Sequence, residues 1–314
     1  MRLLPLPTLF LFLLAVSAWA DGLPVRDGPA AAELVCEHES LQPGRSVTLG
    51  VVLHLDEGWH AYWVNPGDAG QPPAVAWTLP DGYEVGSLAW PAPHRLVEGP
   101  ITSFVYEDEL VLPVTLQVPE DAPEGETTIA AEVSWLACKD QCLPGKAKVS
   151  ITRPVRAGAT KVDRAAHERI ARARDLLPVA VEANVEHEAD RLILTVVGVE
   201  GTPTDFFPEE EGVFDLATLG DVWTSVEAGV FTTTLQLAEA GRAPERLVGV
   251  VVTAEPRKAF AVATPVERGA SVAATEAKGG GPSTVVILAG TVIGLFLLLI
   301  IAMAVLRSGR RNQT

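Results

Sequence analysis

The sequence is poor in cysteine and in positive charge. Only three of its 314 residues are Cys, too few for a disulfide-dense secreted scaffold. Lys and Arg number 24 against 40 Asp and Glu, which gives a net charge of −16. Because a protein that binds the phosphate backbone needs a basic surface, this balance argues against a nucleic-acid-binding protein.

Signatures of common enzymes are also missing. The sequence contains no G-x-S-x-G motif, no P-loop and no glycine pattern of a dinucleotide site, so a hydrolase or a nucleotide-dependent enzyme has no support. No H-E-x-x-H or other paired spacing occurs among the histidines, which we interpret as surface or hydrogen-bonded residues rather than catalysts: His38, His54, His60, His94, His167 and His187. No cofactor is predicted.

Two long apolar runs lie at the ends of the chain. Residues 1–20 combine Arg2, an apolar core and an A-x-A ending, which predicts a signal peptide; an uncleaved anchor is the alternative. Residues 284–306 carry no charge and are long enough to span a bilayer as a helix. Three Arg residues lie in the following tail, 307–314, which the positive-inside rule places in the cytoplasm. The segment between the two runs is therefore predicted to be exported.

This exported segment is more acidic than the whole chain. Four of the 24 basic residues lie outside residues 21–283, whereas all 40 acidic residues lie inside, so the segment has a net charge of −20. Such a surface resists pairing with nucleic acid and with anionic lipid headgroups. Export also places the cysteines where disulfides are permitted.

The pattern of apolar residues is mainly that of β-strands. Apolar residues alternate with other residues over 47–55, 110–118 and 129–137, which predicts a β-sandwich. From Thr160 to Leu177 the spacing becomes helical, with Thr160 and Asp163 resembling a capping box. Further strand patterns follow at 191–197, 230–237, 247–253 and 259–266.

These patterns divide the exported segment into two domains. We expect a first β-domain over 21–155, a helical connector over 156–177 and a second β-domain over 178–267. A Gly-, Ala- and Ser-rich linker is predicted over 268–283.

One cysteine pair is the candidate reactive site. Cys138 and Cys142 lie between two strand patterns, which predicts a hairpin with a three-residue loop and the two Cys directly opposite each other. Cys138 has the opposite parity to Trp135, so both sulfurs are expected to point outward. A disulfide that closes so small a loop is expected to be strained and labile. Thiol exchange and a structural disulfide both remain open from the spacing.

Two further features have alternative interpretations. The C-x-x-x-C pair supplies only two metal ligands, and a metal site would need Cys36 or a His as well. Cys36 lies in an apolar-flanked run and is expected to be a buried free thiol. The aromatic string from Gly58 to Gly70 is interpreted as a core corner with a turn, and a ligand-binding platform is the alternative.

Several strings together resemble a known family. GWHAYWVNPGDAGQPPAVAWTLPDGY, LAWPAP, YEDELVLPVTLQVP and EVSWLACKDQCLPGKAKV occur in the order found in the N-terminal periplasmic domain of the thiol:disulfide interchange protein DsbD, and resemble its ScsB-type relatives more closely. This resemblance covers residues 47–151. DFFPEEEGVFD and RLVGVVVTAEPRKAFAVATPV, within 178–266, resemble the second β-domain of the ScsB-type proteins more weakly.

The resemblance implies an immunoglobulin-like fold and a redox role for Cys138 and Cys142, which occupy the position of the family's Cys pair. It implies a module in the periplasm, anchored in the inner membrane, that exchanges electrons with periplasmic thiol or disulfide proteins. The alternative is a binding or scaffold protein in which the pair is a structural disulfide. The family's multi-helix membrane domain and thioredoxin-like domain are absent, so a separate membrane donor is expected. The family's protective loop falls near residues 94–100 and lacks the aromatic cap residues of some members.

Overall fold

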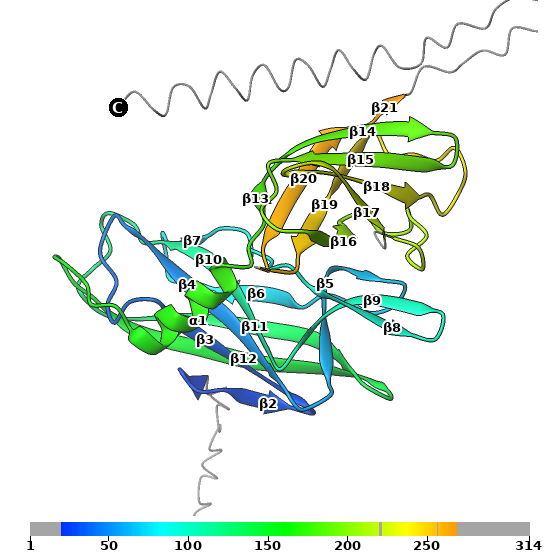
Figure 1. Ribbon diagram of the computed structural model, residues 1–314. Coiled ribbons are helices and arrows are strands. Elements are labelled where there is room, and N and C mark those ends of the chain that lie inside the picture. Colours follow the sequence, from blue (N-terminus) through cyan, green and yellow to red (C-terminus); the bar gives the residue numbers. More distant parts are fainter. Residues whose placement is uncertain (1–19, 220–221, 256, 269–314) are drawn as a thin grey trace, which may run out of the picture. The chain divides into compact units, whose positions relative to one another are not determined.

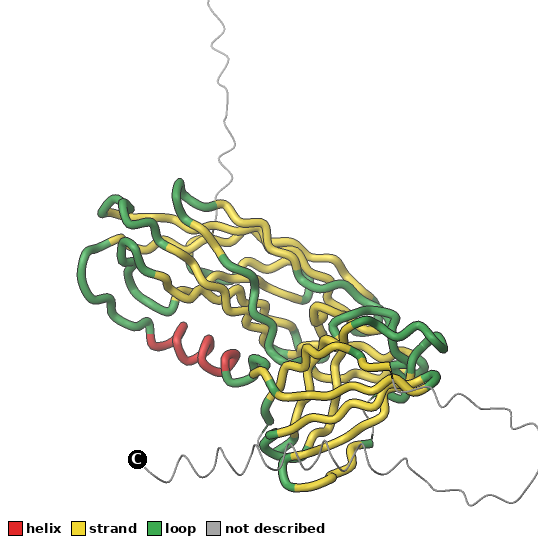
Figure 2. Tube along the Cα trace, turned by 90° about the horizontal axis from the view of Figure 1, so that it is seen from above, coloured by secondary structure: helices red, strands yellow, loops and turns green. Residues whose placement is uncertain are grey.

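The computed structural model describes residues 20–219, 222–255 and 257–268, which belong to one compact unit (Figure 1). Strands dominate this part of the chain, and its single α-helix is drawn in red in Figure 2. Within the described residues no helix is both long and apolar enough to cross a membrane. The predicted membrane helix 284–306 and tail 307–314 lie outside these residues, as do residues 1–19 of the predicted signal peptide and nearly all of the linker.

The first β-domain consists of two sheets. One sheet has the strand order β1-β12-β11-β5-β9-β8, with β6 paired to β11, and the other has the order β2-β3-β4-β10-β7. The strands of the first sheet are β1 (Ala20–Asp21), β12 (Cys142–Val155), β11 (Gly125–Cys138), β5 (His60–Gly67), β9 (Ile101–Glu107), β8 (His94–Glu98) and β6 (Ala74–Thr78). Those of the second are β2 (Val25–Asp27), β3 (Ala30–Cys36), β4 (Ser46–Leu55), β10 (Glu109–Gln117) and β7 (Glu84–Val85).

The alternating pattern accounts for the core of this domain. The predicted strands 47–55, 110–118 and 129–137 correspond to β4, β10 and β11. In β11, Val133, Trp135 and Ala137 are buried in the main core, as their shared parity predicts. On β4, however, Val52 on the opposite face is also fully buried. A second layer therefore covers the outer face of this sheet.

That layer is helix α1, Arg164–Arg174. Ile170 and Ala173 pack on Val52 and Val111 of the sheet. Burying the Ile170 side chain contributes roughly 1.5–3 kcal/mol and the Ala173 methyl less, which holds the helix on the first domain. The predicted cap at Thr160 is wrong, because Asp163 caps the helix by accepting a hydrogen bond from the Ala166 amide at 3.1 Å.

The second β-domain also consists of two sheets. Their orders are β13-β20-β19-β16 and β17-β18-β15-β14-β21. The strands are β13 (Val179–Ala180), β20 (Ala259–Pro265), β19 (Arg246–Thr253), β16 (Pro203–Pro208), β17 (Trp223–Glu227), β18 (Val230–Gln236), β15 (Arg191–Val197), β14 (Glu182–Glu188) and β21 (Glu267–Arg268). The four predicted strands of this region correspond to β15, β18, β19 and β20. Aliphatic and aromatic residues from both sheets belong to the same buried core cluster as those of the first β-domain.

Candidate functional site

The hairpin of β11 and β12 carries the cysteine pair at its tip. Fourteen residue pairs connect the two strands, and the last of them joins Cys138 to Cys142. The two cysteines form a disulfide with their Cα atoms 4.1 Å apart. The three loop residues are closed by the Lys139 amide, which donates to the Gln141 carbonyl at 3.2 Å. The predicted hairpin, loop length and register are confirmed.

The two cysteines differ in exposure. Cys142 is an exposed residue, whereas Cys138 is only 3% exposed. The expectation that both sulfurs point outward to solvent is therefore wrong for Cys138. Its parity is as predicted, since it lies on the face opposite Trp135, but that face is covered. Pairing of β11 with β5 brings Cys138 next to His60, and Tyr62, Val105 and Leu96 pack against it. (These come from β5, β9 and β8.)

Leu96 replaces an aromatic cap in this arrangement. The hairpin of β8 and β9 coincides with the segment where the family's protective loop was expected. Its residue Leu96 is half-buried against the cluster that contains Cys138. The side chains that the β8–β9 hairpin contributes to the cover over Cys138 are thus aliphatic, and Tyr62 of β5 adds an aromatic ring.

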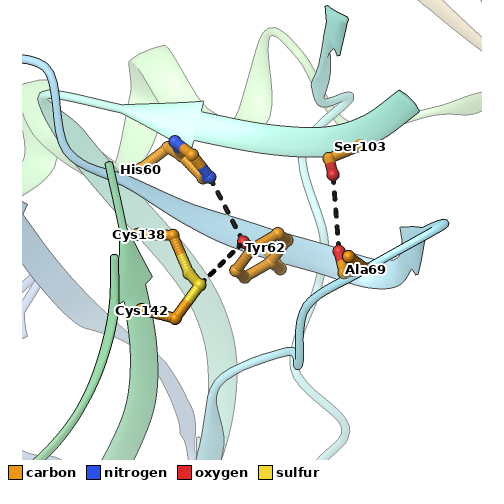
Figure 3. The surroundings of a disulfide bond; sticks show 6 residues. All are labelled: His60, Tyr62, Ala69, Ser103, Cys138 and Cys142. Carbon is orange, nitrogen blue, oxygen red and sulfur yellow. Dashed lines mark hydrogen bonds between the residues drawn. A yellow bond between two sulfur atoms is a disulfide. The ribbon is translucent and has the colours of Figure 1, made fainter. Parts of the chain in front are cut away.

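Two hydrogen-bonding side chains of β5 connect the sheet to the sulfur of Cys142. The Tyr62 hydroxyl lies 3.9 Å from Cys142 Sγ, and His60 Nε2 lies 3.2 Å from the same hydroxyl (Figure 3). Both His60 and Tyr62 are buried. A neutral phenol in this position is able to donate its proton to a Cys142 thiolate, while His60 Nε2–H donates to the phenol oxygen.

Burial keeps the side chains of His60 and Tyr62 neutral. Removal from water lowers the pKa of His60, and the carboxylates of Glu98 and Glu107 only partly oppose this. Burial, with a smaller contribution from Glu98, raises the pKa of the Tyr62 phenol. At neutral pH the phenol therefore retains its proton and remains a donor.

A glycine permits the position of the Tyr62 ring. Gly70 has a φ of +123°, and a Cβ built there would lie 2.2 Å from Tyr62 Cε1. The turn before it is held by Asp68, whose carboxylate accepts a hydrogen bond from the Thr102 amide at 2.8 Å. Ser103 donates to the Ala69 carbonyl at 3.4 Å (Figure 3). The turn thus fixes the strand that carries the phenol.

Sequence reasoning missed His60 and Tyr62 as parts of the site. The string from Gly58 to Gly70 was interpreted as a core corner, and this is correct for Trp63, which is 1% exposed in the main core. Tyr62, its neighbour in the strand, points to the opposite face and reaches the disulfide. The alternation of faces along a strand could have indicated this, because Trp63 in the core requires its neighbour Tyr62 to point to the other face.

The third cysteine and the metal alternative are separate from this site. Cys36 is a free thiol with no exposed surface, as predicted, and burial raises its pKa. Within the part of the chain that the structure describes, no group of three or more His, Cys, Asp or Glu side chains is placed to hold a metal ion.

Comparison with known proteins gives one family match. Residues 31–154 match the model of the family "Thiol:disulfide interchange protein DsbD, N-terminal". No curated protein matches the chain.

Two solved structures illustrate the structural likeness. The N-terminal periplasmic domain of ScsB from Proteus mirabilis is similar with a TM-score of 0.57 and 16% identity, over 80% of this chain and 100% of that one. A protein of unknown function from Porphyromonas gingivalis W83 has a TM-score of 0.26 and 10% identity, over 76% of this chain and 100% of that one. The first likeness concerns the fold, and the second is too distant to support an argument.

Proposed function

Since residues 31–154 form a domain of the DsbD N-terminal type, we propose that this protein is a membrane-anchored thiol:disulfide exchange module of the periplasm. Cys138 and Cys142 would carry electrons between a separate membrane or thioredoxin-like reductase and periplasmic thiol or disulfide proteins. The observation that carries the proposal is the disulfide at the hairpin tip, which joins one exposed and one buried cysteine residue.

The difference in exposure supports a separate role for each cysteine. A donor thiolate attacks the exposed Cys142 sulfur, forming a mixed disulfide and breaking the Cys138–Cys142 bond, whose electron pair leaves as the Cys138 thiolate. A second donor thiol then attacks the mixed disulfide, which releases oxidised donor and the reduced pair. In the onward transfer, the Cys142 thiolate attacks a partner disulfide and Cys138 resolves the product. Two electrons move in each transfer.

A purely structural role is less well supported by the hairpin. The strands β11 and β12 are already paired over 14 residue pairs, and the disulfide lies at their tip. Closing a loop of so few residues constrains the unfolded chain least among disulfides, because the stabilisation grows with loop length. The disulfide is therefore expected to contribute little to the stability of the hairpin.

Trapping in cells tests the proposal. A Cys138→Ala variant keeps the exposed Cys142 and lacks the resolving thiol, so we expect it to accumulate mixed disulfides with periplasmic proteins, visible on non-reducing gels. The matched Cys142→Ala variant keeps only the buried thiol and is expected to trap far less. If neither variant traps a partner, and the wild-type pair stays fully oxidised in cells, the exchange function is wrong and a structural disulfide is favoured.

Membrane attachment is a separate part of the proposal. It rests on the apolar run 284–306 and the three Arg residues of the tail 307–314. The full chain is expected to sediment with membranes after a high-salt wash, whereas a chain ending before residue 284 should be released in soluble form. Recovery of the shortened chain in the washed membranes would contradict the anchor.

A further inference from the structure

The hairpin of β8 and β9 has two faces with different neighbours. Its outer face carries Leu96 and Val105, which pack against Cys138. Its inner face carries Arg95 and Phe104, because neighbouring residues of a strand point in opposite directions. Both of these residues contact the second β-domain. The same short hairpin thus separates the redox site from the second domain.

Two arginines connect the hairpin to the second domain by polar contacts. Arg95 Nε donates to Asp205 Oδ1 of β16 at 2.9 Å, and its Nη1 donates to the Leu216 carbonyl at 3.4 Å. Arg257, in the loop before β20, donates to the Pro93 carbonyl at 2.7 Å, one residue before β8 begins. Its Nη1 lies 3.3 Å from His94 Nδ1.

An aromatic contact lies beneath these polar contacts. The ring of Phe207 in β16 lies 5.1 Å from that of Phe104 and 6.2 Å from that of Trp63, measured between centroids. All three rings are at most 1% exposed. The preceding residue, Phe206, makes an edge-to-face contact with Phe214 of the second domain. Adjacent phenylalanines of one strand therefore contact aromatic rings of both domains.

The hairpin depends on this support because of its place in the sheet. Among the described strands, β8 lies at the edge of the sheet, has five residues and pairs only with β9. Val97 and Ile101 at the tip of the hairpin are exposed, and β8 has no second neighbouring strand to hold it there. Without the second domain, Phe104 would lose its contact with the ring of Phe207, and Arg95 would lose its ion pair with Asp205.

We propose that the second β-domain holds the β8–β9 hairpin over Cys138, and that Asp205, Phe207 and Arg257 are positioning residues for the redox site. The inference rests on the proposed exchange function and deepens it. While the hairpin is held, thiols reach only Cys142, so exchange enters and leaves through one sulfur. When it is released, Cys138 becomes accessible to any small thiol.

The test uses the purified full chain in detergent, reduced and then alkylated with iodoacetamide for increasing times, with each cysteine quantified by mass spectrometry. In Arg257→Ala and Phe207→Ala we expect the alkylation rate of Cys138 to rise about fivefold or more, as for the loss of one stabilising contact from a local opening equilibrium. The rate of Cys142 should change less than about twofold. Arg242→Ala is the matched control, because this arginine makes an exposed ion pair elsewhere in the same domain.

Cys36 separates local opening from loss of the fold. It is fully buried in the first domain's core, so it becomes alkylated only if that core opens. The inference requires that Cys138 is alkylated faster while Cys36 remains protected. If Phe207→Ala does not fold, Arg257→Ala and a charge exchange provide the test. Arg95→Asp should raise the alkylation rate of Cys138, and adding Asp205→Arg should restore the slow rate.

If Cys138 is alkylated at the wild-type rate in folded Arg257→Ala and Arg95→Asp proteins, the inference is wrong, while the exchange function is unaffected. If the Cys138→Ala protein traps no partner in cells, while Cys138 is alkylated faster in Arg257→Ala and Arg95→Asp, the result would instead count against the function alone.

Discussion

The two β-domains of this protein have similar architectures and different chemistry. Each consists of two mainly antiparallel sheets, and buried residues of both domains form one continuous core cluster. The first has a disulfide at the end of its longest hairpin, whereas the second contains no cysteine. Two similar folds differ in whether they carry a redox site, so the fold alone does not produce one. The site forms where the cysteine pair, at the tip of the β11–β12 hairpin, packs against side chains of β5, β9 and β8.

The largest expected effect tests whether the two domains are energetically separate. Phe207→Ala removes a ring shared by both domains and should lower the free energy of unfolding by about 3–5 kcal/mol. Because the ring also supports Phe104, both domains should unfold in one transition, followed by tryptophan fluorescence in urea. Two separate transitions, with only the second shifted, would show that the first domain does not rely on this contact.

The next effect concerns the turn behind Tyr62. Gly70→Ala places a methyl group within 2.2 Å of the ring at a φ of +123°. We expect a loss of about 3 kcal/mol in stability from overpacking and backbone strain, together with slower exchange at Cys142. Gly212→Ala in the second domain is the control, because it also has a positive φ but meets no atom within 4 Å. Equal losses in the two variants would mean that strain alone is responsible.

A third prediction contrasts buried and exposed ion pairs. Hydrogen bonds from Arg174, and then from His167 and Thr48, outweigh burial and lower the pKa of Glu37 from 4.5 to about 2. Its contribution to stability is therefore complete above pH 4.5 and is lost as the pH falls towards 2. Glu37→Gln should cost about 2 kcal/mol at pH 7 and remove this part of the acid dependence.

The control for this prediction lies in the second domain. Glu239 pairs with Arg242 on the surface, with both side chains more than 70% exposed. Glu239→Gln should change the unfolding free energy by less than about 0.5 kcal/mol at any pH. The measurement is urea unfolding between pH 3 and pH 7, a range that includes the loss of stability expected below pH 4.5. A Glu37→Gln protein with unchanged acid dependence would contradict the assignment to this carboxylate.

The smallest effect concerns the hydroxyl of Tyr62. Tyr62→Phe removes the donor that faces Cys142 Sγ and keeps the ring. We expect a slower thiolate reaction at Cys142 by about fivefold, with its pH profile moved to higher pH, because one hydrogen bond to the charged form is lost. Unfolding free energy should remain close to wild type. An unchanged pH profile would show that the hydroxyl does not stabilise the thiolate.

Much of the first domain could be predicted from sequence because its apolar residues alternate regularly. The register of Cys138 against Cys142 follows from local spacing, and the immunoglobulin-like fold of this domain was implied by the family resemblance. The burial of Val52 could not be predicted in the same way, because it depends on helix α1, more than 100 residues away in sequence. The predicted exposure of Cys138 is wrong for a similar reason, because the side chains that cover it come from β5, β8 and β9.

What the sequence determined by itself is local: the strand pattern, the hairpin tip with its disulfide, and the helix that follows. Period-two and helical spacings act through neighbouring residues, so they can be read along the chain. The tertiary structure alone decided which sulfur is exposed, that Tyr62 reaches it, and that Phe207 of the second domain supports the hairpin beside it. These depend on contacts between residues far apart in sequence, which no local spacing encodes.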